Sequence, residues 1–192
     1  MARNADWPRH LNSERDEGYL WESFRPRLID AIKALYHAYP TEIAKLKPIQ
    51  VTLKYVDAVA FEPAESQVPL LRFLRESLHV GVEVEPLLFT RSEEAQSPNG
   101  LSLTLTYGLD KPRGAVILRI GNGTRSGSTA AIWETTVISK GADVPNEVER
   151  FGTWLNDAHE VSDRWFFTLV RGKLLESFET KPDANSTTQI QN

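Results

Sequence analysis

The chain has 192 residues, of which 41% are hydrophobic and 25% are charged, and its net charge is −4. These values are typical of a globular domain with an ordinary core, and the negative charge gives no electrostatic reason to expect nucleic-acid or membrane binding. Cysteine is absent, which excludes disulfides, thiolate metal sites and a cysteine nucleophile. The sequence has neither an apolar run long enough to span a membrane nor the apolar core of a signal peptide at its start. We therefore expect a cytoplasmic protein.

The two ends of the chain differ in composition from its middle. Residues 1–20 are polar and predict an irregular N-terminal segment, and residues 179–192 predict a disordered tail. Residues 21–178 predict a single α+β domain. Within it, apolar residues between Ser23 and Tyr39 recur every three or four positions, which predicts an amphipathic helix that ends at Pro40.

The period then changes to two. From Ile49 to Phe61, alternate residues are apolar, which predicts a long strand. Asp57 lies on the apolar face of this strand, next to Tyr55 and Val59. After it, residues 68–78 predict a short helix and residues 80–89 predict a second strand.

The second half of the chain predicts most of the sheet. Leu101 to Leu109 alternate with polar residues, which is typical of an antiparallel strand with one buried face. Residues 110–114 predict a turn, and two further strands follow at 115–120 and 130–139. A long helix is predicted from 147 to 178, with Gly172 as its weak point. This order favours an α+β fold with a mostly antiparallel sheet of about five strands, helices on one face and a long C-terminal helix.

Three glycines, Gly121, Gly123 and Gly127, lie close together in the segment RIGNGTRSGSTAAIW. A phosphate-binding loop needs a helix directly after its glycines, because the free N–H groups of that helix bind the phosphate. The residues that follow here are rich in β-formers, so the segment predicts a hairpin. The alternative is a loop that binds an anion through Arg125.

Two residues are candidates for chemistry. A buried carboxylate such as Asp57 needs a partner, so it either braces a neighbouring backbone or has a function. His159 and Asp163 are four residues apart on the last predicted helix, a spacing that predicts a side-chain contact. Two such residues without a third do not make a metal site, and we expect neither a metal nor a cofactor.

The chain also has five tryptophans. Trp154 and Trp165 are eleven residues apart on the last predicted helix, which places them on the same side. With Tyr107 and Trp133 they are candidates to line an apolar pocket or a partner surface. The alternative is that these side chains simply pack in the core.

Two segments, LKPIQVTLKYVDAVAF and WLNDAHEVSDRWFFTLV, resemble an uncharacterised, sporadically distributed bacterial protein family. Its members carry a strand that ends in Tyr-hydrophobic-Asn and a late helix with Leu-His-Glu followed by Phe. The corresponding residues here are Tyr55-Val56-Asp57, with Asp where Asn is usual, and Ala158-His159-Glu160 followed by Phe166, with Ala where Leu is usual. The resemblance covers about residues 18–178. It implies a chain that lacks the family's N-terminal strand-containing segment and so has an exposed sheet edge, and it implies no activity or cofactor.

The leading functional hypothesis is a non-enzymatic protein that binds another protein or a second copy of itself, and does not bind nucleic acid or membranes. The first alternative is a protein that holds a small apolar ligand between the sheet and the C-terminal helix. The second is an enzyme that uses Asp57 or His159 as a base. The candidate ligand or partner surface consists of Tyr55, Asp57, Tyr107, Trp133, Trp154, His159 and Trp165.

Overall fold

The structure is a computed structural model that describes residues 20–38, 46–61, 70–83 and 100–179. The predicted N-terminal segment and C-terminal tail lie almost entirely outside the described residues. The elements in chain order are α1 (Trp21–Ala38), β1 (Gln50–Ala60), α2 (Leu70–Glu76), β2 (Ser102–Asp110), β3 (Arg113–Arg125), β4 (Ser128–Lys140), a short 3-10 helix (Gly141–Asp143), α3 (Val148–Leu169) and α4 (Lys173–Glu179).

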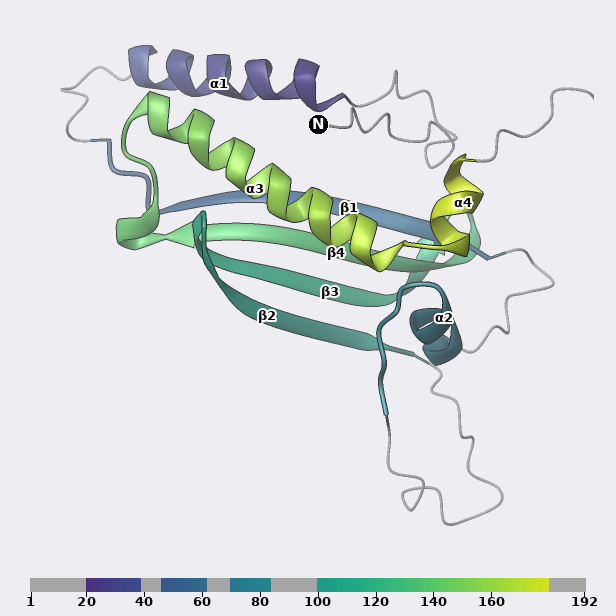
Figure 1. Cartoon of the computed structure of the whole chain (residues 1–192). Coiled ribbons are helices and arrows are strands. Elements are labelled where there is room, and N and C mark those ends of the chain that lie inside the picture. Colours follow the sequence, from purple (N-terminus) through teal and green to yellow (C-terminus); the bar gives the residue numbers. More distant parts are fainter. Residues whose placement is uncertain (1–19, 39–45, 62–69, 84–99, 180–192) are drawn as a thin grey trace, which may run out of the picture.

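The fold is α+β, with an open antiparallel sheet in the order β1-β4-β3-β2. Figure 1 shows α3 lying across one face of this sheet, with α1 packed on α3 and α2 near the other end. The predicted long C-terminal helix and the antiparallel pairing are therefore confirmed. None of the helices in the described ranges is long and apolar enough to cross a membrane.

The expectation of about five strands is wrong for the described part of the chain, which forms four. The missing strand is the one predicted for residues 80–89. Val80 to Glu83 have no regular structure, and the remaining residues of that prediction lie outside the described ranges. The alternating valines Val80 and Val82 instead pack against the core beside α2, and a buried apolar side chain does not need a strand to carry it.

The glycine-rich segment is a hairpin, as the sequence predicts. β3 runs through the first two glycines, and a two-residue turn at Ser126 and Gly127 leads into β4. Both turn residues have positive φ, 50° and 82°, as expected for a hairpin turn whose twist matches the strands. The Arg125 guanidinium donates a hydrogen bond of 2.9 Å to the carbonyl oxygen of Ala58, so this arginine fastens the hairpin to β1.

The C-terminal helix is not continuous, which corrects the prediction of one helix from 147 to 178. α3 ends at Leu169 and α4 begins at Lys173. Gly172 lies between them with a φ of 78°, a left-handed conformation that glycine adopts at helix ends without steric cost. The break redirects the chain so that Phe178 stacks on Phe166, with 6.5 Å between the ring centroids.

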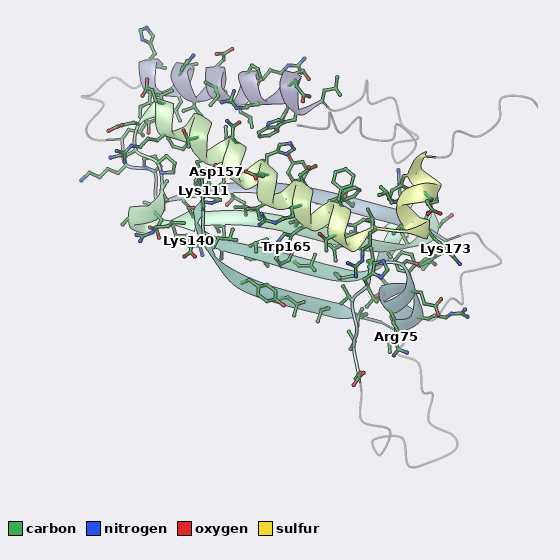
Figure 2. The ribbon with its side chains drawn as sticks, in the orientation of Figure 1. Arg75, Lys111, Lys140, Asp157, Trp165 and Lys173 are labelled. Carbon is green, nitrogen blue, oxygen red and sulfur yellow. The ribbon has the colours of Figure 1, made fainter. Side chains whose placement is uncertain are left out.

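Two apolar clusters fill the space between the sheet and the helices. The Trp133 cluster joins β3 and β4 to α2, to α4 and to the C-terminal part of α3, while the Trp154 cluster joins the other end of the sheet to α3 and α1. Lys111, in the turn between β2 and β3, lies beside Asp157 of α3 (Figure 2), with 3.2 Å between the charged atoms. The helix is therefore held to the sheet along most of its length.

The opposite face of the sheet carries charges at its centre. Glu134 of β4 is paired with Lys54 on one side and with Arg119 on the other. The hydrogen bond from Lys54 is the main cause that holds the pKa of Glu134 below its ordinary value, helped by Thr136 and Arg119, while burial acts in the opposite direction. The described helices leave this face uncovered. The candidate site lies on the other face of the sheet, which the helices cover.

Substitution of Gly114 by alanine should destabilise the protein by about 3 kcal/mol or more. Gly114 has a φ of 148°, and an added Cβ atom would collide with the carbonyl oxygen of Ile138. Gly108→Ala is the matched control, because nothing lies within 4 Å of the Cβ position there. Urea unfolding of both variants measures the effect. Equal stability of the two variants would contradict the close approach of β3 and β4.

Candidate functional site

A depression opens between β1, β4 and α3 on the helix-covered face of the sheet. It is lined by Tyr55, Asp57, Thr135, His159, Ser162, Asp163 and Phe166. The strand residues reach it because Tyr55 is paired with Thr135 in register and Asp57 with Trp133, which puts their side chains on one face. The helix residues reach it because they are spaced three or four apart along α3.

His159 connects three elements at the rim of this depression. Its Nδ1 lies 3.0 Å from the Tyr55 hydroxyl of β1, and its ring stacks on that of Trp21 of α1, with 4.0 Å between the centroids. Burial lowers the pKa of His159 from its ordinary value of 6.5, while Asp163 and Glu22 oppose the shift. The imidazole is therefore mostly neutral at pH 7, and with its proton on Nε2 it accepts the hydrogen bond from Tyr55 at Nδ1.

The carboxyl group of Asp57 is the most unusual group in the depression. Asp57 is only 9% exposed, and it makes no hydrogen bond or ion pair with any described residue. Burial raises the pKa of Asp57 from 3.8 to about 7, because the ionised carboxylate is separated from water without an opposite charge to compensate. Near pH 7 the group therefore exists as a mixture of its protonated and ionised forms.

Two further oxygen atoms in the depression lack partners among the described residues. The Thr135 hydroxyl is buried and unpaired, and so is Oδ1 of Asp163. Burial raises the pKa of Asp163, and His159 partly offsets the rise. Ser162 differs from these groups, because its hydroxyl donates a hydrogen bond of 3.0 Å to the carbonyl oxygen of Ala158. Oxygens of Asp57, Thr135 and Asp163 thus border one small space without satisfied hydrogen bonds.

The depression is small. About 220 Å³ lies between and above its walls, but this figure includes open solvent, and the walls leave no room for a water-sized group. A drug-sized ligand, which needs roughly 300–1,000 Å³, therefore does not fit. Aromatic rings of Tyr55 and Phe166 form part of the wall.

The structure brings together only part of the candidate surface named from the sequence. Tyr55, Asp57 and His159 line the depression, while its described lining includes none of the other four residues. Tyr107 and Trp165 contact each other edge to face, with centroids 5.6 Å apart, and Figure 2 shows Trp165 between α3 and the sheet. Trp133 is fully buried beneath Phe166. Trp154 is buried too, and its Nε1 donates to the Ser139 hydroxyl at 2.8 Å.

Sequence reasoning did not include Thr135, Ser162 or Phe166 of the depression among its candidate site residues, nor Trp21, which stacks on His159 from outside the lining. Thr135 carried a signal, since it lies between Trp133 and Val137 on the buried face of β4, just as Asp57 lies on the buried face of β1. Polar residues are seldom buried, so a polar residue at an inward position of a strand is a candidate site residue. Trp21 carried no comparable signal, because its contact with His159 depends on how α1 packs on α3.

Within the described ranges, no group of three histidine or acidic side chains is arranged to hold a metal ion. The two segments that carry the family resemblance meet at the hydrogen bond between Tyr55 and His159. No family model matches the chain, and no curated protein matches it.

Asp57→Asn should make the protein more stable at neutral pH and leave it nearly unchanged near pH 4. The unfolded state releases the Asp57 proton near 3.8 and the folded state only near 7, so wild-type stability falls as the pH rises between these values. The rise in pKa corresponds to about 4 kcal/mol of unfolding free energy that the wild type loses as the pH rises. The variant has a neutral amide at this position and does not undergo this loss. Urea unfolding from about pH 4 to about pH 8 measures the difference between the two proteins.

His159, Asp163 and Tyr55 line the depression together with the Asp57 carboxyl group, and the charge of Glu22 acts on His159. They are present in both proteins, so the difference between the two curves reports Asp57. If the unfolding free energies of the two proteins changed with pH in parallel, the Asp57 carboxyl group would be solvated in the folded protein.

Trp21→Ala should raise the pKa of His159 toward its ordinary value. The indole ring covers one face of the imidazole, and its removal lets water reach the ring and stabilise the charged form. NMR titration of the ring resonances measures this pKa. Phe24→Ala is the control, because its ring lies near Trp21, 6.4 Å between centroids, on the same helix. An equal pKa change in both variants would show that the effect comes from α1 as a whole.

Proposed function

We propose that the protein acts by binding, and that the depression around Asp57 receives a hydrogen-bond donor from its partner. The observation that carries this proposal is the pair of buried, unsatisfied oxygens of Thr135 and Asp163, which lie in one depression with the buried carboxyl group of Asp57. Folded proteins satisfy nearly all of their buried polar groups, because an unpaired one costs free energy. A partner that supplies the missing donors offsets this cost on binding.

The small volume of the depression supports another protein, or a second copy of this chain, as the partner. Because its walls leave no room for a water-sized group, the depression does not hold a separate small molecule, and a partner would contact its polar groups from the surface. The rest of such a partner would rest on the surface around the depression, to which the exposed Glu22 of α1 belongs. This proposal keeps the interaction hypothesis from the sequence.

A second candidate function is acid–base catalysis. The hydrogen-bonded pair of Tyr55 and His159 favours it, because it adjoins a carboxyl group whose pKa is about 7, close to the value that suits a general acid or base at neutral pH. The two functions differ in what they require. Catalysis with His159 as the base needs this side chain to accept a proton, whereas binding to Asp57 and Thr135 tolerates His159→Gln; catalysis with Asp57 as the base is lost in Asp57→Asn.

Site-specific photo-crosslinking in the host cell tests the binding proposal. A benzophenone amino acid at Glu22, beside the depression, should give one defined protein adduct or a crosslinked dimer. Asp57→Leu in the same chain should reduce this adduct at least tenfold, since the branched apolar side chain fills the site and offers no acceptor.

The control places the same crosslinker at Thr104, an exposed residue of β2 whose side chain lies on the opposite face of the sheet. We expect no adduct there that depends on Asp57. Adducts that are equally strong with and without Asp57→Leu would contradict the proposed role of the depression. Adducts that persist in Asp57→Leu but disappear in His159→Gln would contradict it as well.

A further inference from the structure

The open sheet ends in two edge strands, and they differ in how their free sides are protected. β1 and β2 are the outer strands in the order β1-β4-β3-β2, so each has one side with which no described strand pairs. The free side of an edge strand presents N–H and C=O groups to which another chain can add a strand. Natural proteins usually prevent this with charged side chains, prolines, bulges or covering elements.

Several of these protections are present on β1. Lys54 lies on its outer face and is paired with Glu134, while Asp57 places an ionisable group on its buried face. The Arg125 guanidinium donates a hydrogen bond to the carbonyl oxygen of Ala58. A strand that paired with β1 would therefore lie beside ionisable side chains on both faces of the sheet.

The described residues give β2 none of these protections. Ser102 to Leu109 include no charged residue and no proline, and the pairing with β3 runs without a bulge to Asp110. Figure 1 shows α2 near the end of β2 at which Ser102 lies, and no described helix beyond the rest of its free side. The side chain of Tyr107 is 52% exposed, although it contacts Trp165. β2 is thus an uncharged strand whose free side is open to another chain.

The side chains of β2 match a second copy of β2 that runs in the antiparallel direction. A two-fold axis at the central residue, Thr106, places Leu103 opposite Leu109 of the second copy. Leu105 likewise lies opposite Tyr107 of the second copy, on the helix-covered face of the sheet. On the outer face, Thr106 lies opposite its own counterpart. Cross-strand pairs of apolar or aromatic side chains, and of threonines, stabilise neighbouring strands.

The one charged residue of β2 favours the same direction. Asp110 is the last residue of the strand, so antiparallel pairing places the two aspartates at opposite ends of the interface, whereas parallel pairing would place them side by side. The contact is also closed, because it uses both β2 strands and leaves the protected β1 strands at the two outer edges. A second copy therefore fits this edge without starting an open-ended assembly.

We propose that two copies of the chain associate through antiparallel pairing of their β2 strands, which joins two four-stranded sheets into one continuous sheet. β1 and β2 lie at opposite edges of the sheet, so the depression between β1, β4 and α3 stays accessible in both copies. The β2 contact therefore does not depend on the proposed function of that depression.

Analytical ultracentrifugation of the full-length chain over a range of concentrations tests the proposal. We expect a reversible monomer–dimer equilibrium with no larger species. Thr106→Lys should raise the dissociation constant of the dimer at least tenfold, because two ammonium groups then face each other at the two-fold axis. Thr52→Lys is the matched control, because Thr52 is an exposed threonine on the outer face of the other edge strand. It should leave the dissociation constant unchanged.

Opposite charges at the axis give a test that a loss of folding cannot imitate. Thr106→Glu alone should weaken the dimer as Thr106→Lys does. An equimolar mixture of these two variants should instead form a heterodimer at least tenfold tighter than either variant forms with itself. A mixture that stays monomeric at the concentrations at which the unchanged protein is dimeric would overturn the proposed pairing.

Cysteine crosslinking tests the register. The chain has no cysteine, so Thr106→Cys introduces a single thiol, which should form a disulfide-linked dimer under mild oxidation because directly opposed residues on paired strands lie close enough for this bond. Thr52→Cys should stay monomeric under the same conditions. A chain that is monomeric at every concentration, or a dimer that crosslinks equally through both thiols, would overturn the proposal.

Discussion

The register between β1 and β4 is the constraint on which the candidate site depends. Side chains alternate between the two faces of a strand, so the register that places Leu53 and Tyr55 under α3 also buries Asp57. A shift of one residue would move the carboxyl group to the outer face, but it would also expose those apolar neighbours. The hydrogen bond from Arg125 to the backbone of β1 holds the same pairing at its far end. The cost of burying the carboxyl is therefore imposed by the core itself.

The helix above this strand adapts to the same constraint. α3 presents His159 and Asp163 toward β1 and keeps Ala158 and Val161 in the core, which lets one helix serve both the interior and the depression. His159 in turn is covered by Trp21, so the position of α1 controls how much water reaches the imidazole. A protein with only structural demands would gain stability from an apolar residue in place of Asp57, and sites retained at such a cost are commonly functional.

How far the sequence predicts this molecule depends on the range of the interactions involved. The alternation in β1 and β4 predicted both strands and the inward position of Asp57, because a strand pattern is local. For the break between α3 and α4, the sequence predicted only a weak point at Gly172. The contact of Phe178 with Phe166 that stabilises the broken helix is made across the core, and no local pattern reveals it. Val80 and Val82 show why the extra strand was predicted: their alternation is real, but no described strand pairs with them. The meeting of Trp21, Tyr55 and His159 required the packing of three distant segments, which no single stretch of sequence reveals.

The pairing of β1 has a consequence for how the chain is made. Among the described strands, β1 is bonded only to β4, and Gln50 meets Lys140. Ribosomes release the chain from its N-terminus, so β1 leaves the exit tunnel long before its partner has been synthesised. During that interval the apolar residues of β1 and its backbone hydrogen-bonding groups have no native partner, a state that favours aggregation or chaperone binding. The hairpin of β3 and β4 forms from neighbouring residues, so we expect it to form first and β1 to pair with its β4 edge afterwards.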